Sequence, residues 1–286
     1  MLNTSAQSNL QLQLNQLNVL QQQSSSGIAI SKPSDNPMGT AQSLALKQQL
    51  AANSQYSSNA TDALNWLTSV NGALTDTTTA LQSVRTLTVE AGNSGSQSAS
   101  SKAAIVAQLQ SLKSQLMSDA NTTYLGRSVF AGNSDAGTAF NSDYSYNGTA
   151  GETVTRRIGP DTSVSVSGDG AAVYGTGSNS VFALIDTISS DITSGTDTNG
   201  QLANVDTAIS AVSNQQAIVG ANYTQVQAKQ ANLTTQASTL TTQRTNIDNV
   251  DMTKAVVDLT AQQTAYQAAL DVTSKVLQPT LISLLS

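Results

Sequence analysis

Apolar residues recur at alternating steps of three and four along most of the chain, which is the spacing of one face of an α-helix. The longest such run continues without a slip from Leu202 to Ile247 and predicts a coiled-coil-like helix. At a rise of 1.5 Å per residue, this helix extends for roughly 70 Å, which is too long for the interior of a compact domain. The pattern therefore predicts an elongated, helical protein.

A second run predicts a helix of matching length from Pro37 to Ala91, and a shorter run of the same spacing extends from Ile105 to Leu116. Three helices can share one apolar seam. The seam positions of the second run are Ala63, Leu67, Val70, Leu74, Thr77, Leu81, Val84 and Thr88. The seam of the longest run includes three polar positions, which we interpret as tolerated or register-setting: Gln216, Gln230 and Arg244.

Between about residues 122 and 200 the pattern changes, because Gly, Ser and Asp become dense and apolar residues alternate with a period of two. The residues Gly-Pro-Asp-Thr at 159–162 separate two such alternating stretches and predict a hairpin turn. Apolar residues at helical spacing return between Val181 and Ile192. This segment predicts a small α+β insert between two helical halves.

Both ends of the chain carry apolar stripes at helical spacing, and Pro279 ends the C-terminal helix. Isolated helices have marginal stability in water, so each end needs the other end or a neighbouring molecule as a partner. The stripes predict an assembly interface that comprises Leu10, Leu14, Leu17, Val256, Leu259, Tyr266, Leu270, Leu277, Leu281, Leu284 and Leu285.

The fold class is therefore expected to be mainly α with a small α+β insert, an elongated helical bundle or coiled coil formed by pairing of the N- and C-terminal segments. We expect three parts. Residues 1–40 and 253–286 form a terminal coiled-coil domain, 41–130 and 201–252 a helical core, and 131–200 the inserted outer domain. In the free monomer, we expect residues 1–40 and 253–286 to be largely disordered until assembly buries their stripes.

Composition narrows the possible partners. The net charge is −6 with no basic stripe on any expected helix, which argues against nucleic acid. Only 10% of residues are charged, so solubility depends on neutral polar side chains. No cleavable signal peptide is expected, since the first basic residue is Lys32, and no apolar run approaches the roughly 20 residues of a membrane span.

The chain has no His and no Cys, which excludes Ser-His, Cys-His and zinc-His sites. A hydrolase that uses a pair of carboxylates remains conceivable. However, the acidic residues are scattered singly along the sequence, and a role as solvated surface charges explains this distribution equally well. The Gly-rich segment 168–177 does not fit a phosphate-binding loop. We therefore predict no catalytic residue, no metal site and no cofactor.

Five segments carry a family resemblance. Residues 24–44, SSSGIAISKPSDNPMGTAQSL, resemble the turn between terminal and core domains in the flagellin superfamily. There one proline breaks a helix, an acidic or amide residue caps the next helix, and a second proline occupies its first turn. The turn comprises Pro33, Ser34, Asp35, Asn36 and Pro37. Residues 78–93 resemble a helix of the same superfamily and place Arg85 as an intersubunit contact or an exposed helix charge.

Residues 126–140, 146–159 and 250–286 are similar to the hook-associated protein 3 family, including the ending LQPTLISLLS. This resemblance implies a non-enzymatic structural subunit at the junction of the flagellar hook and filament. It implies assembly with copies of itself, contacts with hook-associated protein 1 and flagellin, an export chaperone, and type III export to the cell exterior. A short flagellin, a flagellin-like adhesin or carbohydrate receptor, and a carboxylate hydrolase remain open alternatives.

Overall fold

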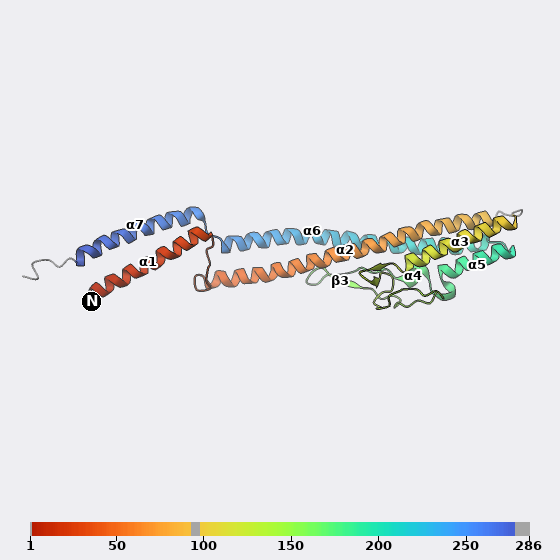
Figure 1. The fold of residues 1–286 in the computed structure, drawn as a ribbon, viewed down its shortest axis with the longest axis horizontal. Helices are drawn as coiled ribbons and strands as arrows, with labels where there is room; N and C mark the ends of the chain where they lie inside the picture. The colour runs from red at the N-terminus through yellow and green to blue at the C-terminus, as the bar shows by residue number, and fades with distance from the viewer. Residues whose placement is uncertain (1, 93–97, 278–286) are drawn as a thin grey trace, which may run out of the picture. The chain divides into compact units, whose positions relative to one another are not determined.

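The computed structural model describes residues 2–92 and 98–277. Its long helices are α1 (Leu2–Ser26), α2 (Pro37–Gly92), α3 (Ala99–Ala120), α6 (Asn199–Asp248) and α7 (Met252–Leu277). The shorter elements are the strands β1 (Thr123–Tyr124), β2 (Arg127–Ser128), β3 (Thr155–Arg157) and β4 (Ser163–Ser165), and the helices α4 (Gly170–Tyr174), η1 (Gly177–Asn179) and α5 (Val181–Ser194). The expected fold class, mainly α with a small α+β insert, is confirmed (Figure 1).

The chain forms two compact units. The first contains residues 1–52 and 236–286, and the second contains residues 53–235. The long helices α2 and α6 contribute residues to both units. The insert belongs to the same compact unit as most of the helical core, while the expected three-part division into terminal, core and inserted domains remains a prediction.

In the second unit, the predicted seam of α2 is buried along its whole length, from Ala63 to Thr88. The helix α6 runs antiparallel to α2, since the Gln230 amide donates to the Thr61 hydroxyl and the Thr198 hydroxyl donates to the Thr88 carbonyl. Every seventh residue of α6 is buried against this unit: Val205, Val212, Val219, Val226 and Leu233. The seam positions between them stay partly exposed, so α6 buries only one edge of its stripe.

An aromatic cluster joins the insert to α2. The ring centroids of Phe130, Phe140 and Phe182 lie between 5.4 and 5.9 Å from that of the buried Tyr174. The hydroxyl groups of Tyr174 and Thr77 lie 2.8 Å apart in a hydrogen bond. Thr77 is therefore a polar residue in an apolar seam because its hydroxyl satisfies the one polar atom of the buried tyrosine.

The hairpin expected around residues 159–162 is confirmed, because β3 pairs antiparallel with β4 in the register Arg157 to Ser163. Its two arginines face opposite sides. The Arg156 guanidinium lies over the Trp66 ring and pairs with Asp62 at 2.6 Å, whereas the Arg157 guanidinium lies over the Tyr56 ring. The hairpin is thereby held to the first half of α2.

One carboxylate in the second unit lacks compensation. Asp119, near the end of α3, is partly buried, and its Oδ2 atom accepts no hydrogen bond from any described residue. Burial raises the pKa of Asp119 to about 6, and the nearby charge of Asp76 on α2 adds to this shift. The folded chain therefore retains a proton on Asp119 that the unfolded chain has already lost above about pH 4.

We expect the Asp119→Asn variant to be more stable than the natural chain at pH 7 and equally stable near pH 4. The folded-state pKa is raised, so stability falls as the pH rises from about 4 to about 6 and the full penalty is present above that window. Because Asp119 is only partly buried and solvent screens its charge, we expect about 1 kcal/mol, or a rise in Tm of about 2–4 °C. Thermal unfolding followed by circular dichroism across this pH range measures the difference.

The exposed Asp161→Asn variant serves as the matched control and should follow the natural profile at every pH. A Tm of Asp119→Asn that equals that of the natural chain at pH 7 would show that Asp119 carries no penalty.

Candidate functional site

The two ends of the chain form an antiparallel helix pair within the first unit. The helix α1 lies alongside α7, in red and blue in Figure 1. On α1, the predicted interface residues Leu10, Leu14 and Leu17 are half-buried. A side-chain hydrogen bond of 3.3 Å from the Gln262 amide to the Gln13 carbonyl joins the two helices. The expected pairing of the chain ends is present in this structure.

On α7, the packed face differs by about one residue from the predicted stripe. The sheltered residues recur at steps of four and three: Ala255, Leu259, Gln262, Tyr266, Ala269 and Thr273. Leu259 and Tyr266 were expected there. In contrast, Val256 is 52% exposed and Leu270 is 42% exposed. The apolar arc of α7 is wider than one seam, and spacing alone does not choose between two adjacent stripes.

The remaining predicted interface residues lie at the C-terminal end. Leu277 is the last residue of α7, and its side chain is outside the described part. Leu281, Leu284 and Leu285 lie outside the described residues. The assembly role of the whole predicted set stays a prediction.

Both terminal helices expose further apolar residues. On α1, Leu12 is 63% exposed and Val19, seven residues later, is 47% exposed. On α7, a second apolar face, which we call the outer stripe, consists of the exposed residues Val257, Ala261, Ala265, Ala268 and Val272. Exposed apolar rows of this kind mark interaction surfaces in soluble proteins.

Charge is distributed unevenly between the two units. The first unit has five basic and five acidic residues, so its net charge is zero, and α1 has no charged residue. The remaining seven basic and thirteen acidic residues give the second unit the whole net charge of −6. A unit without net charge does not repel a second copy of itself over long range, which suits the first unit to contact with other copies.

Local hydrogen bonds shape the segment before α2. The Asp35 carboxylate accepts hydrogen bonds from the backbone amides of Ser31 and Lys32. The Asn36 side chain accepts from the backbone amide of Gly39 at 2.8 Å and so caps α2, whose first residue is Pro37. Pro33 and Ser34 complete the exposed turn.

A backbone bridge that the sequence did not reveal joins the two linkers of the first unit. The Ala29 amide donates to the Asp248 carbonyl at 2.7 Å, and the Val250 amide donates to the Gly27 carbonyl at 3.0 Å. Gly27 ends α1 with a φ of +70°, a conformation that favours glycine. The linker that follows α1 and the linker that precedes α7 are therefore fastened side by side.

Arg85, expected as an intersubunit contact or an exposed charge, forms an ion pair of 2.7 Å with Asp206 of α6. Both side chains remain about half exposed. The hydrogen bond and the charge of Asp206 raise the pKa of the Arg85 guanidinium. Within one chain, Arg85 thus helps hold α2 to α6, and its contact with another subunit stays a prediction.

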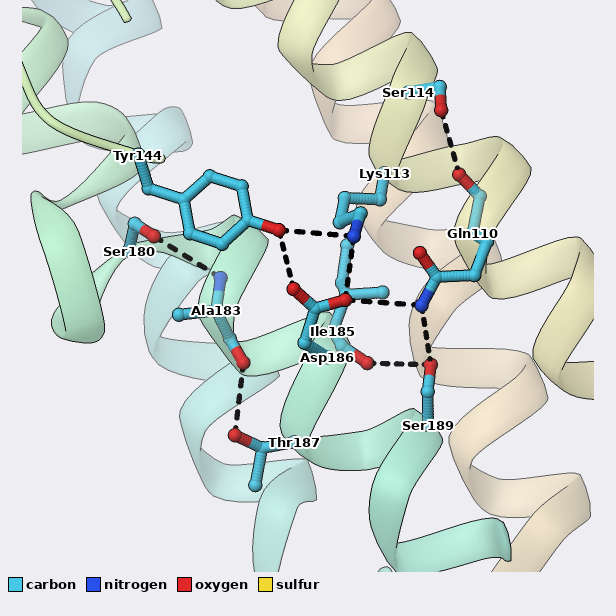
Figure 2. A network of polar contacts seen from close by, with 10 residues as sticks. All are labelled: Gln110, Lys113, Ser114, Tyr144, Ser180, Ala183, Ile185, Asp186, Thr187 and Ser189. Atoms are coloured by element: carbon cyan, nitrogen blue, oxygen red, sulfur yellow. Dashed lines mark hydrogen bonds and ion pairs between the residues drawn. The ribbon is translucent and has the colours of Figure 1, made fainter. Parts of the chain in front are cut away.

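The densest polar cluster of the insert joins three segments (Figure 2). The Lys113 ammonium of α3 lies 2.6 Å from the Asp186 carboxylate of α5 and 3.0 Å from the Tyr144 hydroxyl. The Tyr144 hydroxyl donates to the other Asp186 oxygen at 2.5 Å, and Gln110 donates to Asp186 at 3.1 Å. Nothing local in the sequence marks this cluster, because its members come from distant segments.

These contacts compensate one another electrostatically. Burial alone raises the pKa of Asp186, but hydrogen bonds from Lys113, Tyr144 and Gln110 outweigh it, and the pKa is lowered. Burial lowers the pKa of Lys113, but its bonds to Asp186 and Tyr144 reverse the direction, and the pKa is raised. Tyr144 adopts a φ of +67°, which is unusual for a tyrosine and is held by this cluster. The cluster joins the segment around Tyr144 and the helix α5, both within the insert, to α3.

Within residues 2–92 and 98–277, no group of three or more carboxylates gathers in a way that could hold a metal ion. In the same part of the chain, no helix has the length and apolar character of a membrane span.

Two family models match this chain. The bacterial flagellin N-terminal helical region matches residues 1–135, and the bacterial flagellin C-terminal helical region matches residues 202–285. The chain belongs to the flagellin family. The matched regions contain the terminal pair, the turn before α2 and most of the long helices.

Two kinds of flagellar protein are among the curated relatives. Flagellar hook-associated protein 3 of Salmonella typhimurium is 38% identical over 114 residues, which is 40% of this chain and 36% of that protein. Flagellin of Bacillus subtilis is 29% identical over 259 residues, which is 86% of this chain and 84% of that protein. The chain thus matches about a third of the length of that hook-associated protein and most of the length of that flagellin.

Solved structures with a similar fold include FlgL of Bacillus cereus, which is 22% identical with a TM-score of 0.61 and covers 70% of this chain and 99% of that one. The flagellar hook associated protein-3 of Legionella pneumophila is 14% identical with a TM-score of 0.63, covering 71% and 98%. At these identities the likeness concerns the fold.

We expect Lys113→Met to lower the free energy of unfolding by about 1–3 kcal/mol, because it leaves the partly buried Asp186 carboxylate without its cation. Urea unfolding of the full chain, followed by circular dichroism, measures the change. Arg85→Met is the matched control, since it also removes the cation of a pair between helices, but at an exposed site where no measurable change is expected. Equal midpoints for the two variants would contradict a stabilising role of the cluster.

Proposed function

We propose that this chain is a structural, non-enzymatic subunit of the bacterial flagellum that forms the junction between hook and filament and assembles through its terminal helices. The observation that carries the proposal is the paired ends of the chain, which expose apolar rows on a unit of zero net charge. Membership of the flagellin family supports a flagellar structure as the destination of these surfaces.

Two observations favour the junction over the filament itself. The curated relatives include hook-associated protein 3 at 38% identity, and the chain carries the sequence LQPTLISLLS, which is similar to that family. In this proposal the chain assembles with copies of itself and contacts hook-associated protein 1 on one side and flagellin on the other. An export chaperone delivers it, and type III export carries it to the cell exterior.

The second candidate is a short flagellin, the subunit of the filament. One specific observation favours it, since the match to Bacillus subtilis flagellin extends over 86% of this chain. Both candidates use the terminal pair in the same way, so the location in the flagellum distinguishes them.

Deletion of the gene separates the two candidates. If the chain forms the junction, cells that lack it should complete their hooks and release flagellin into the medium, because export continues while the filament has no base on which to assemble. Immunoblots of the medium and electron microscopy of the hooks measure this outcome. Two outcomes would contradict the junction role. One is intact filaments, and the other is bare hooks with no other flagellin in the medium.

We expect protease to cleave the terminal helices of the dilute monomer first. Most residues at the contact between α1 and α7 are only half-buried, and among the described residues of the two helices only Ala255 is fully buried. Assembly should protect the same sites. Limited digestion with a protease of broad specificity, followed by mass spectrometry, locates the cuts. The segment 53–85 of α2 serves as the internal control, and equal rates in both regions of the monomer would contradict a weakly held pair.

A further inference from the structure

A groove of about 410 Å³ lies in the first unit, beside the bridged linkers. The apolar side chains that line it are Ile28, Ile30 and Leu44, and Ser43 is buried within it. Ile28 is 44% exposed and Leu44 is 56% exposed. When another apolar surface covers leucine and isoleucine side chains that are exposed together around a groove, their removal from water lowers the free energy.

Among the described residues, the rim of this groove has one ion pair and one cation that forms none. Arg244 and Asp248 pair with each other at 3.2 Å across one turn of α6. Lys47 also lines the groove, and no described residue forms an ion pair with it. The groove therefore offers apolar side chains and one positive charge to an occupant.

The outer stripe of α7 has the complementary chemistry. Val257 is 61% exposed and is followed by the exposed alanines of the stripe, whose small side chains permit close approach of a helix backbone. Asp258 adjoins Val257 and forms no ion pair with any described residue. The exposed row of α1, in contrast, offers Leu12 and Val19 but no charge at all.

We propose that this groove receives the outer stripe of α7 from a second copy of the chain, with Val257 and Ala261 against Ile28 and Leu44 and with Asp258 paired to Lys47. This assignment rests on the proposed self-assembly and names the surfaces that carry it. Each copy has both a groove and a stripe at different places, so the contact is head-to-tail and continues from one copy to the next.

The absence of cysteine from the chain allows a direct test. Two single-cysteine variants of the full chain, Leu44→Cys and Val257→Cys, are mixed, allowed to assemble and oxidised. One of them carries an affinity tag, so that the mixed dimer separates from either homodimer on a gel. A disulfide requires Cβ atoms about 3.5–4.5 Å apart. The control pair is Leu44→Cys with Thr260→Cys, since Thr260 is exposed at the same level of α7 but on its polar side. We expect the yield of mixed dimer from Leu44→Cys and Val257→Cys to exceed that of the control pair at least fivefold.

The outcomes separate this proposal from the proposed function. If the variants sediment as assemblies and the mixed dimer does not exceed the control, the groove assignment is overturned and self-assembly stands. If the natural chain does not sediment as an assembly at any concentration, both are overturned. Mixed dimers that exceed the control support both.

Exchange of charges gives a second, independent test. Lys47→Glu should raise by about fivefold the concentration at which half of the chain sediments, and Asp258→Lys in the same chain should restore it. Lys32→Glu is the matched control, since Lys32 is exposed in the same unit but does not line the groove. The pairing of Lys47 with Asp258 would be overturned if Lys47→Glu and Lys32→Glu had equal effects. It would also be overturned if Asp258→Lys did not restore assembly of the Lys47→Glu chain.

Discussion

The burial of one stripe on α2 is the constraint on which the remaining structure depends. Its eight seam side chains, from Ala63 to Thr88, are at most 1% exposed, although the chain has few large apolar residues from which to form a core. Each neighbouring element is held against this stripe or its flanks: α6 through every seventh residue, the insert through Tyr174 and Thr77, and the hairpin through Trp66. A thin core of this kind stabilises a long helix only if several partners share it.

The first unit has no comparable stripe. In the described part of α1 and α7, only Ala255 is fully buried, and Leu10, Leu14 and Leu17 of α1 are half-buried. The pair therefore leaves much of its apolar surface free, together with a groove and an outer stripe whose chemistries match. The contrast divides the chain into a part that is complete by itself and a part that another molecule completes, which agrees with its place in a family of subunits that build flagella.

Regular spacing made the long helices and the seam of α2 predictable, since burial follows directly from a repeat of three and four. The same spacing did not determine which row of α7 packs against α1, because Val256 and Ala255 belong to adjacent rows and only the position of α1 decides between them. The turn before α2 was predictable because capping and proline chemistry are local. The cluster of Lys113, Tyr144 and Asp186 and the bridge between the linkers were not, because each joins segments that are far apart in the sequence.

The bridge between Gly27 and Val250 has a mechanical consequence. A pull on α7 alone stretches the short connection to α6, but the two backbone hydrogen bonds transmit part of that force to the linker behind α1 and so to the start of α2. Tension is then divided between the covalent connection to α6 and a second path through the bridge. In the proposed place between a bending hook and a stiff filament, this second path lowers the load on the connection between α6 and α7.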